Sequence, residues 1–468
     1  MDLHFLTIAE ASQLLRSKQL SPVELTEAFL TRVRTLDAQL NSYLLPLEAQ
    51  AIADARRAEA EIAAGNWKGP LHGIPIGLKD IYNTAGIRTT GHSALFRDHV
   101  PTEDAFTVAL LRAAGAVILG KLSTWEFAIG GASFDLPWAP ARNPWNPLYE
   151  PGGSSSGSGA AVAAGLAMAA MGTDTGGSIR GPASWCGIAG LKPTYGYLSR
   201  RGILPLSFSL DHAGPMCWTS EDCALMMQVL AKHDPLDAAS AQVTTPDFAA
   251  ALGGDLNGLR IGVPRHFFET DLITDPEVLQ AFNAAMQVFR SLGASVRDVT
   301  LAPLGHFTDV NGLITAAEAY AIHRQWLLKT PELYGERGRL RIMAGAFVSA
   351  ADYVNAQRER ARLISEVAGA MQDIDLLMMP TRHVVAPILG DYDSSVGPSL
   401  TRPFNMTGYP ALSICNGFNS AGLPISLQIG GRPFEDHIVL KAGHAYEKAT
   451  SFRSIRPSLT PDLAAAAN

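Results

Sequence analysis

The chain has 468 residues, of which 47% are hydrophobic and 17% charged, and its net charge is −7. This apolar content excludes a disordered protein, which lacks the surface needed to build a core. No long basic stretch occurs, so the electrostatic footprint of a nucleic-acid binder is missing. The low charge indicates a large buried core, and the 43 glycines indicate tight turns around a site.

Hydrophobic periodicity and capping signals predict alternating helices and strands. The predicted elements in chain order are a helix over 6–18, a helix from Pro22 with Ser21 as N-cap, a helix over 48–64, a strand over 74–78, a helix over 104–114, a strand over 116–120, a small-residue helix over 158–171, a strand over 258–264, a helix over 276–291, a strand over 294–301, a helix over 353–372, strands over 374–379, 411–416 and 424–430, and a helix over 436–449. The repeated helix-then-strand order predicts α/β layers. Only residues 234–256 look like a surface excursion, and no linker is evident, so we expect one large domain.

The N-terminal sequence, the longest apolar stretch and the cysteine spacing indicate the cellular compartment in which the protein is expected. The first twenty residues lack a basic segment followed by an apolar core, so no secretory signal is predicted. The longest nearly apolar stretch, 160–171, is shorter than the roughly 20 residues of a membrane span. No Cys-x-x-Cys pair occurs, so we expect buried free thiols in a reducing compartment rather than a zinc site. The protein is therefore expected to be cytoplasmic; its cysteines are Cys186, Cys217, Cys223 and Cys415.

The segment over 151–194 holds the densest group of glycines and serines, and its first part, 151–173, carries no charged side chain. Phosphate-binding loops are excluded, because no lysine follows the glycines at the required spacing and Val162 occupies a required glycine position. Residues 153–157 formally match the Gly-x-Ser-x-Gly nucleophile elbow around Ser155, but a Gly/Ser-rich sequence produces this pattern by chance. No Ser-x-x-Lys pattern occurs either. What remains is a serine hydrolase whose serine is activated by something other than histidine.

This segment, GGSSSGSGAAVAAG followed by GTDTGGSIRGPASWCGIAGLKPT, resembles the amidase signature family. Four further motifs resemble that family in order, over residues 73–80 (GIPIGLKD), 114–121, 143–146 and 416–431. The resemblance covers most of residues 6–450. It implies a single large α/β/α sandwich around a mixed β-sheet, spanning 1–468, with a signature core at about 65–215, a variable region at about 230–370 and the C-terminal part of the core sheet at about 373–450.

The family uses a Ser–cis-Ser–Lys triad, and the resemblance assigns its three members. Ser178 is implied as the nucleophile, Ser154 as the bridging serine with a cis peptide bond, and Lys79 as the base. A lysine can act as a base only when it is neutral, so burial must lower its pKa from about 10.4 toward 7–8. The apolar neighbours of Lys79 in IPIGLKDI are consistent with that requirement.

Other residues of the segment are expected to support the triad. The resemblance places an oxyanion hole on the backbone N–H groups of Thr175, Gly176, Gly177 and Ser178. Asp174 and Arg180 flank this loop and are expected to orient it, with pairing between the two as one way of doing so. Ser155 is expected to form hydrogen bonds near the triad. No metal or cofactor is expected.

The expected activity is hydrolysis of carboxylic amides through an acyl-enzyme on Ser178, with esters, anilides and carbamates open to the same chemistry. The expected partners are a small-molecule amide, ester or carbamate, with no nucleic acid, no membrane, and a monomer or homodimer. The alternative is the catalytic subunit of a glutamine-dependent tRNA amidotransferase, which passes ammonia to a partner. Two departures argue against it: Ser156-Gly157-Ser158 replaces the usual Ser-Gly-Gly, and residues 397–404 contain no acid where an acidic motif is expected. A non-enzymatic relative is disfavoured because the triad is intact.

Overall fold

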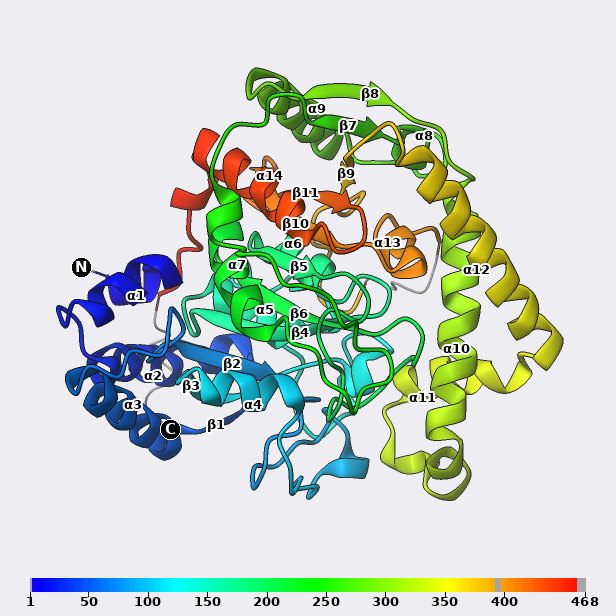
Figure 1. The fold of residues 1–468 in the computed structure, drawn as a ribbon. Coiled ribbons are helices and arrows are strands. Elements are labelled where there is room, and N and C mark those ends of the chain that lie inside the picture. The colour runs from blue at the N-terminus through cyan, green and yellow to red at the C-terminus, as the bar shows by residue number, and fades with distance from the viewer. Residues whose placement is uncertain (1, 392–396, 461–468) are drawn as a thin grey trace.

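The computed structural model describes residues 2–391 and 397–460. Within them, eleven strands form one mixed sheet in the order β1-β3-β2-β4-β6-β5-β10-β11-β9-β7-β8 (Figure 1). The strands are β1 (Tyr43–Pro46), β2 (Pro75–Lys79), β3 (Val117–Leu122), β4 (Ala169–Asp174), β5 (Ala189–Lys192), β6 (His212–Cys217), β7 (Arg260–Val263), β8 (Ser295–Asp298), β9 (Leu376–Pro380), β10 (Ala411–Phe418) and β11 (Pro424–Gly431). In the centre, β2 runs parallel to both β3 and β4, whereas β6 pairs antiparallel with β4.

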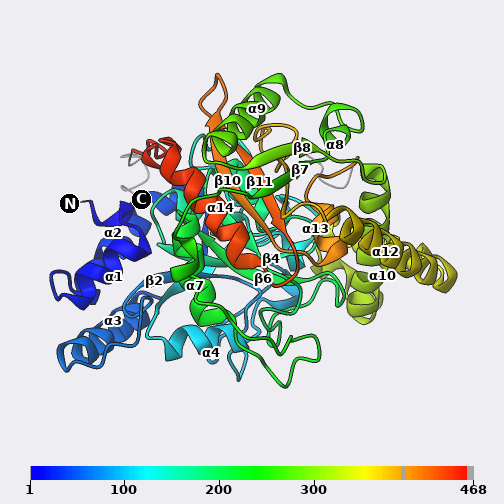
Figure 2. The same ribbon diagram turned by 45° about the horizontal axis from the view of Figure 1, so that its top comes forward.

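Helices cover both faces of this sheet. The α-helices are α1 (Ile8–Arg16), α2 (Pro22–Leu40), α3 (Glu48–Ala63), α4 (Phe106–Ala113), α5 (Ser156–Ala163), α6 (Arg180–Cys186), α7 (Ser220–Leu230), α8 (His266–Glu269), α9 (Pro276–Ser291), α10 (Leu304–Lys329), α11 (Glu336–Met343), α12 (Ala350–Ala370), α13 (Arg402–Thr407) and α14 (Asp436–Ala449). Helices α7 and α14 pack together on one face, and α5 and α6 on the other. Helices α10 and α12 lie side by side at one margin of the molecule (Figures 1 and 2). This arrangement confirms the predicted α/β sandwich around a mixed sheet.

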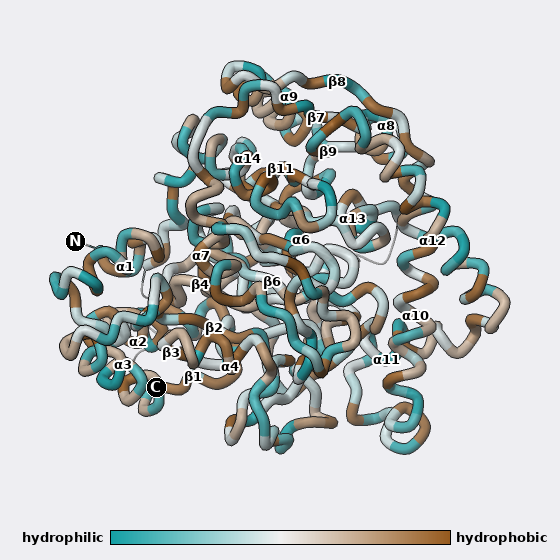
Figure 3. Tube along the Cα trace, viewed as in Figure 1, coloured by the Kyte–Doolittle hydropathy of each residue, from teal (hydrophilic) through white to brown (hydrophobic). Residues whose placement is uncertain are grey.

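The core lies along the central strands, and the signature segment runs through it. Hydrophobic residues follow β2 and β4 and hydrophilic residues gather on outer helices such as α3 (Figure 3). Every residue of α5 is buried. Its small side chains allow the helix to sit close to the neighbouring backbone, since a Cβ on Gly157 would collide with the carbonyl oxygen of Ser42 and the backbone of Ser123. The small, uncharged residues of α5 are therefore explained by its close packing against the neighbouring backbone.

One predicted helix is in fact a shorter helix followed by a strand. The sequence pattern predicts a single helix over 158–171, but α5 ends at Ala163 and strand β4 begins at Ala169. Gly165, at φ +68°, lies in the left-handed region and breaks the helix there. The apolar run that follows is long enough for a strand, and pairing with β2 and β6 decides its conformation.

Helix α10 is absent from the sequence-based prediction, although it has 26 residues. Its buried face includes the polar side chains of Asn311, Glu318 and His323, so its sequence shows no apolar stripe at helical spacing. The helix predicted over 436–449, by contrast, coincides with α14. The division into a signature core and a variable region stays a prediction.

Two further observations concern location and redox state. Within residues 2–391 and 397–460, every helix is too short or too polar to span a bilayer. The four cysteines are free thiols and are all buried.

Candidate active site

Lys79 is the last residue of β2, and its side chain is completely buried. Its Nζ donates hydrogen bonds to Ser154 Oγ at 2.7 Å and to Thr173 Oγ1 at 2.8 Å. Burial lowers the pKa of Lys79 from 10.5 to about 7, although the negative charges of Asp211 and Asp174 oppose this shift. A lysine in this environment can exchange a proton near neutral pH.

Ser154 follows a cis peptide bond between Gly153 and Ser154. Its carbonyl oxygen accepts hydrogen bonds from the Trp125 N–H at 3.0 Å and from the Thr124 hydroxyl at 2.9 Å. A Cβ on Gly153 would collide with the Trp125 indole, so only glycine leaves room for this ring. The strand end at β3 thus holds the Ser154 backbone while Lys79 holds its hydroxyl.

Ser178 lies in the turn between β4 and α6, and it is half-buried. Its carbonyl oxygen accepts a hydrogen bond from the Ser155 N–H at 3.3 Å, which joins the nucleophile turn to the start of α5. Both Ser178 and Gly153 line the same cavity. The structure therefore brings the segments carrying Lys79, Ser154 and Ser178 together, as the resemblance implies.

Asp174 shapes the turn that carries Ser178. Its carboxylate accepts hydrogen bonds from the N–H groups of Gly177 at 2.7 Å and Ile179 at 3.1 Å. It also pairs with Arg180 at 3.0 Å, and both side chains are fully buried. Burial alone would raise the pKa of Asp174, but the charge and hydrogen bonds of Arg180 outweigh it and hold the pKa below its usual value. This ion pair fixes the loop rather than entering the cavity.

The backbone N–H groups of this turn differ in their hydrogen bonding, and the oxyanion hole at Thr175, Gly176, Gly177 and Ser178 stays a prediction. The N–H of Gly177 already donates to Asp174. Among the described residues, no acceptor is bound to the N–H groups of Gly176 or Ser178, so these two stay available. Gly177 instead provides the turn itself, because its φ of +128° suits glycine and a Cβ there would collide with Thr401.

The hydroxyl of Ser155 has different hydrogen-bond partners from the hydroxyl of Ser154. Its hydroxyl accepts a hydrogen bond from the Thr173 N–H at 3.2 Å and donates to the Thr173 carbonyl oxygen at 3.3 Å. It is fully buried and does not line the cavity of Ser178. The arrangement fits a residue that ties α5 to β4, and not the nucleophile of an elbow.

Sequence reasoning missed three polar residues of the site, Thr173, Asn405 and Gln428. Thr173 is the second hydrogen-bond partner of Lys79. Asn405 accepts from Arg180 at 2.7 Å and donates to Asp174 at 2.8 Å, and Gln428 accepts from Arg180 at 3.0 Å. The sequence signal that could have identified Gln428 is its position within the apolar run PISLQIGG, because a buried polar side chain needs a hydrogen-bond partner.

The buried ion pair between Asp174 and Arg180 gives the first prediction. Replacing Arg180 with methionine is expected to lower the free energy of unfolding by about 3–5 kcal/mol, because Asp174 then stays buried without its counter-charge. Urea unfolding measures this change. The matched control is Arg297→Met, since Arg297 is exposed and its pair with Asp373 spans 3.9 Å; its effect is expected within about 0.5 kcal/mol. Equal effects of the two substitutions would contradict the structural role of the pair.

The cavity above Ser178 has a volume of about 430 Å³. Its floor is the nucleophile turn, and its walls come from the loop after β3, from α10 and α11, and from the segments around 382 and 399–402. The lining residues are Trp125, Ala128, Ile129, Gly153, Thr175, Gly176, Gly177, Ser178, Leu206, Asn311, Gly312, Thr315, Ala316, Leu340, Arg341, Ala344, Arg382, Ser399 and Arg402. A cavity of this volume lies within the range of small-molecule sites in proteins.

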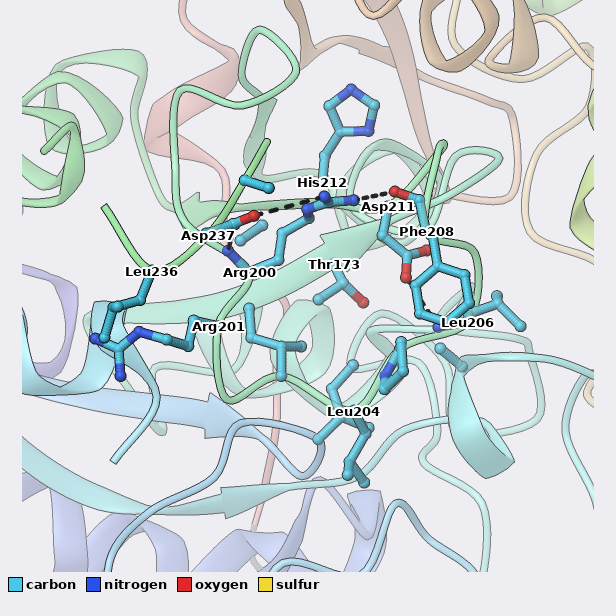
Figure 4. Close-up of a pocket in the computed structure, with 16 residues that line it drawn as sticks. Thr173, Arg200, Arg201, Leu204, Leu206, Phe208, Asp211, His212, Leu236 and Asp237 are labelled. Atoms are coloured by element: carbon cyan, nitrogen blue, oxygen red, sulfur yellow. Dashed lines mark hydrogen bonds and ion pairs between the residues drawn. The ribbon is translucent and has the colours of Figure 1, made fainter. Parts of the chain in front are cut away.

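A second cavity of about 290 Å³ adjoins the first, and the two share Ala128 and Leu206. It is lined by Thr173, whose hydroxyl binds Lys79. Figure 4 shows Arg200 directed toward Asp237 at its rim, and these two side chains form an ion pair at 3.8 Å. Thr173 therefore links the buried Lys79 to this second cavity.

The chain is similar in sequence and fold to known proteins. The family model described as Amidase matches residues 24–440. The A subunit of glutamyl-tRNA(Gln) amidotransferase from Geobacter metallireducens is 40% identical over 483 aligned positions, covering 97% of this chain and 99% of that protein. A solved structure described as a vestigial protein complex that reveals the evolutionary origins of an s-triazine catabolic enzyme has a TM-score of 0.90 at 30% identity, over 97% of this chain and 100% of that one. The structure of the same amidotransferase subunit from Thermotoga maritima has a TM-score of 0.80 at 32% identity, over 96% and 95%.

These relatives correct the expected partners. The prediction of a small-molecule substrate, no nucleic acid, and a monomer or homodimer is wrong, because relatives along nearly the whole chain are named as subunits of an amidotransferase for glutamyl-tRNA(Gln). The missing basic stretch bears only on direct electrostatic contact between this chain and nucleic acid, and says nothing of a tRNA held by another subunit. The relatives also favour the amidotransferase alternative over a stand-alone amidase. Cleavage of esters or carbamates stays a prediction.

Proposed function

The chain belongs to the amidase family, and from this we propose that it is the amide-cleaving subunit of an amidotransferase of the glutamyl-tRNA(Gln) type. The observation that carries the proposal is the 40% identity to a subunit of such an enzyme along 97% of the chain. It is supported by the buried Lys79–Ser154 hydrogen bond beside the cavity of Ser178, which suits amide hydrolysis. The proposed donor is glutamine, and the ammonia released is passed to a partner subunit that holds the tRNA.

In the proposed mechanism, neutral Lys79 accepts a proton from Ser154, which in turn takes the proton of Ser178. The Ser178 oxygen then attacks the amide carbonyl carbon and forms a tetrahedral intermediate. When this intermediate collapses, the C–N bond breaks and the proton returns through Ser154 to the leaving nitrogen, which departs as ammonia. Water attacks the resulting ester on Ser178 by the same proton route and releases the carboxylic acid, so that the enzyme is restored.

The negative charge of the intermediate needs donors in the nucleophile turn. We assign this role to the N–H groups of Gly176 and Ser178, with that of Thr175 beside them, because Gly177 already donates to Asp174. Backbone donors of this kind act without reorganisation and each contribute about 2.7–4 kcal/mol to transition-state stabilisation. The Asp174–Arg180 pair keeps the turn in the shape that presents them.

The test uses the full chain, tagged in its native host and isolated without denaturants. The expected result is that partner subunits are retained and that the preparation converts Glu-tRNA(Gln) to Gln-tRNA(Gln) with glutamine as the amide donor. The matched control is the same preparation carrying Ser178→Ala, which is expected to keep the partners and lose the conversion. A chain that is isolated alone and shows no tRNA-dependent activity would overturn the proposal.

A further inference from the structure

Helix α11 forms part of the wall of the cavity above Ser178. Leu340 and Arg341 line the cavity from the helix itself, and Ala344 lines it directly after the helix ends. The N-cap residue of α11 is Gly335, which has no side chain to accept a hydrogen bond from the first turn. The position of this wall therefore depends on acceptors that another segment of the chain supplies.

The first of these acceptors is Glu126, in the loop after β3, which is 2% exposed. Its Oε2 accepts a hydrogen bond from the Gly335 N–H at 3.0 Å, and its Oε1 accepts one from the Ser93 hydroxyl at 2.6 Å. Asp135 adds a second contact, since its carboxylate accepts the Glu336 N–H at 2.8 Å. Two carboxylates from the segment after β3 thus face the N-terminus of α11, where negative charge is favourable.

Two glycines allow the helix to come this close to the loop. A Cβ on Gly338, in the first turn of α11, would lie 2.6 Å from Glu126 Oε2. A Cβ on Gly130, in the same loop as Glu126, would lie 2.9 Å from the backbone nitrogen of Gly338. Real Cβ contacts are not this short, so a side chain at either position would disturb the contact. The loop and α11 therefore meet along the first turn and not only at one hydrogen bond.

The residue before Glu126 supports the bridging serine. Trp125 donates its backbone N–H to the Ser154 carbonyl oxygen at 3.0 Å, and its indole occupies the space beside Gly153. Trp125 and α11 line the cavity, whereas Glu126 does not. Glu126 therefore lies behind the cavity wall, between α11 and the loop that holds Ser154.

We propose that Glu126 is a positioning residue for substrate binding, whose carboxylate fixes the first turn of α11 and thereby the wall that Leu340 and Arg341 present to the substrate. This rests on the proposed hydrolysis of an amide at Ser178. The triad is carried by β2, by the start of α5 and by the turn after β4, and not by α11. A displaced α11 is therefore expected to weaken substrate binding more than it slows the chemical step.

The experiment measures ammonia release from glutamine at pH 8.5 by the full chain with the partner subunits it retains. Burial raises the pKa of Glu126 to about 7, although hydrogen bonds from Ser93 and Gly335 oppose this shift, so the carboxylate is ionised at the pH of the assay. Glu126→Ala leaves the buried Gly335 N–H without its acceptor, so KM is expected to rise about tenfold or more and kcat to change by less than about threefold. Glu126→Gln keeps an oxygen that can accept this N–H, so its KM is expected within about threefold of the wild-type value.

Gly338→Ala probes the same contact from the helix side. The added Cβ either displaces α11 or moves the Glu126 carboxylate, so KM is expected to rise about fivefold or more. The collision is absent in Glu126→Ala, so the double variant is expected to match Glu126→Ala within about twofold. The matched control is Gly369→Ala in α12, where a Cβ meets nothing within 4 Å, and it is expected to keep the wild-type KM.

Glu447→Ala is the control for the loss of a buried glutamate as such. Glu447 is also buried and accepts a backbone N–H at the start of a helix, that of Ser220 in α7, at 2.8 Å. It does not line the cavity, so this variant is expected to keep the wild-type KM. Hydrogen exchange read by mass spectrometry gives a local measurement. The amides of residues 337–343 are expected to exchange about tenfold faster or more in Glu126→Ala, and at the wild-type rate in Glu447→Ala.

The outcomes separate this inference from the proposed function. A wild-type KM in both Glu126→Ala and Gly338→Ala would overturn it, as would an equal rise of KM in Glu447→Ala. If Glu126→Ala does not fold, Gly338→Ala decides, and an unchanged KM in that variant contradicts the inference. If the wild type releases no ammonia from glutamine, the proposed function fails and hydrogen exchange decides the inference. Unchanged exchange of residues 337–343 in both variants would then overturn it, and faster exchange confined to these residues would support it.

Discussion

Ser178→Ala is expected to lower the rate of amide hydrolysis by about 10⁴- to 10⁶-fold, because removal of a nucleophile stops covalent catalysis and leaves only binding and the oxyanion donors. Ser178 is half-buried and lines the cavity, so a substrate carbonyl can reach its hydroxyl. Labelling by a fluorophosphonate, read by intact-protein mass, gives a measurement that needs no knowledge of the substrate. The wild type is expected to gain one label, and Ser178→Ala none.

Ser155→Ala is the matched control for this prediction. Ser155 is the nucleophile in the alternative based on the Gly-x-Ser-x-Gly pattern, whereas the structure ties its hydroxyl to the backbone of Thr173. The variant is therefore expected to be labelled at Ser178. If the label persisted in Ser178→Ala and vanished in Ser155→Ala, the nucleophile assignment would be wrong.

The pH dependence of the reaction is expected to follow Lys79. Its pKa of about 7 means that the base is protonated and inactive below this pH. On the acid side, kcat/KM is therefore expected to fall about tenfold per pH unit. Lys79→Met keeps the apolar volume but cannot accept a proton, so it is expected to lower kcat by about 10²- to 10⁴-fold and to remove this acid limb. An unchanged profile in the variant would show that another group is the base.

Stability gives an independent measurement of the same pKa. The folded pKa of Lys79 lies below the unfolded value near 10.5, so between about pH 7 and 10.5 the unfolded chain binds the proton and the folded chain does not. The free energy of unfolding of the wild type relative to Lys79→Met is therefore expected to rise with pH across this window, by at most about 1.4 kcal/mol per pH unit. Urea unfolding at several pH values checks it, and a flat difference would contradict the lowered pKa.

Local sequence determined much of the fold, because capping and periodicity act over a few residues. The helix that begins at Pro22 behind the Ser21 cap and the final helix over 436–449 lie where their patterns predict them. The segment over 158–171 does not, because its uniformly small residues show no period and the pairing of β4 with β2 and β6 decides between helix and strand. Helix α10 was not predicted from the sequence because its buried face is partly polar.

The sequence by itself determined the family, the order of the motifs and the identity of the residues proposed as the triad, because those motifs are short, local and specific. Only the tertiary structure decided what surrounds them. Thr173 beside Lys79, the engagement of the Gly177 N–H by Asp174, and the convergence of Arg382 and Arg402 on the cavity all join residues from different segments. The glycines that first indicated a site allow side chains to lie close to the backbone. The Trp125 indole does so at Gly153, and the Arg382 guanidinium does so at Gly181. Burial, the pKa of Lys79 and the charge of a cavity depend on such long-range contacts, and no local pattern encodes them.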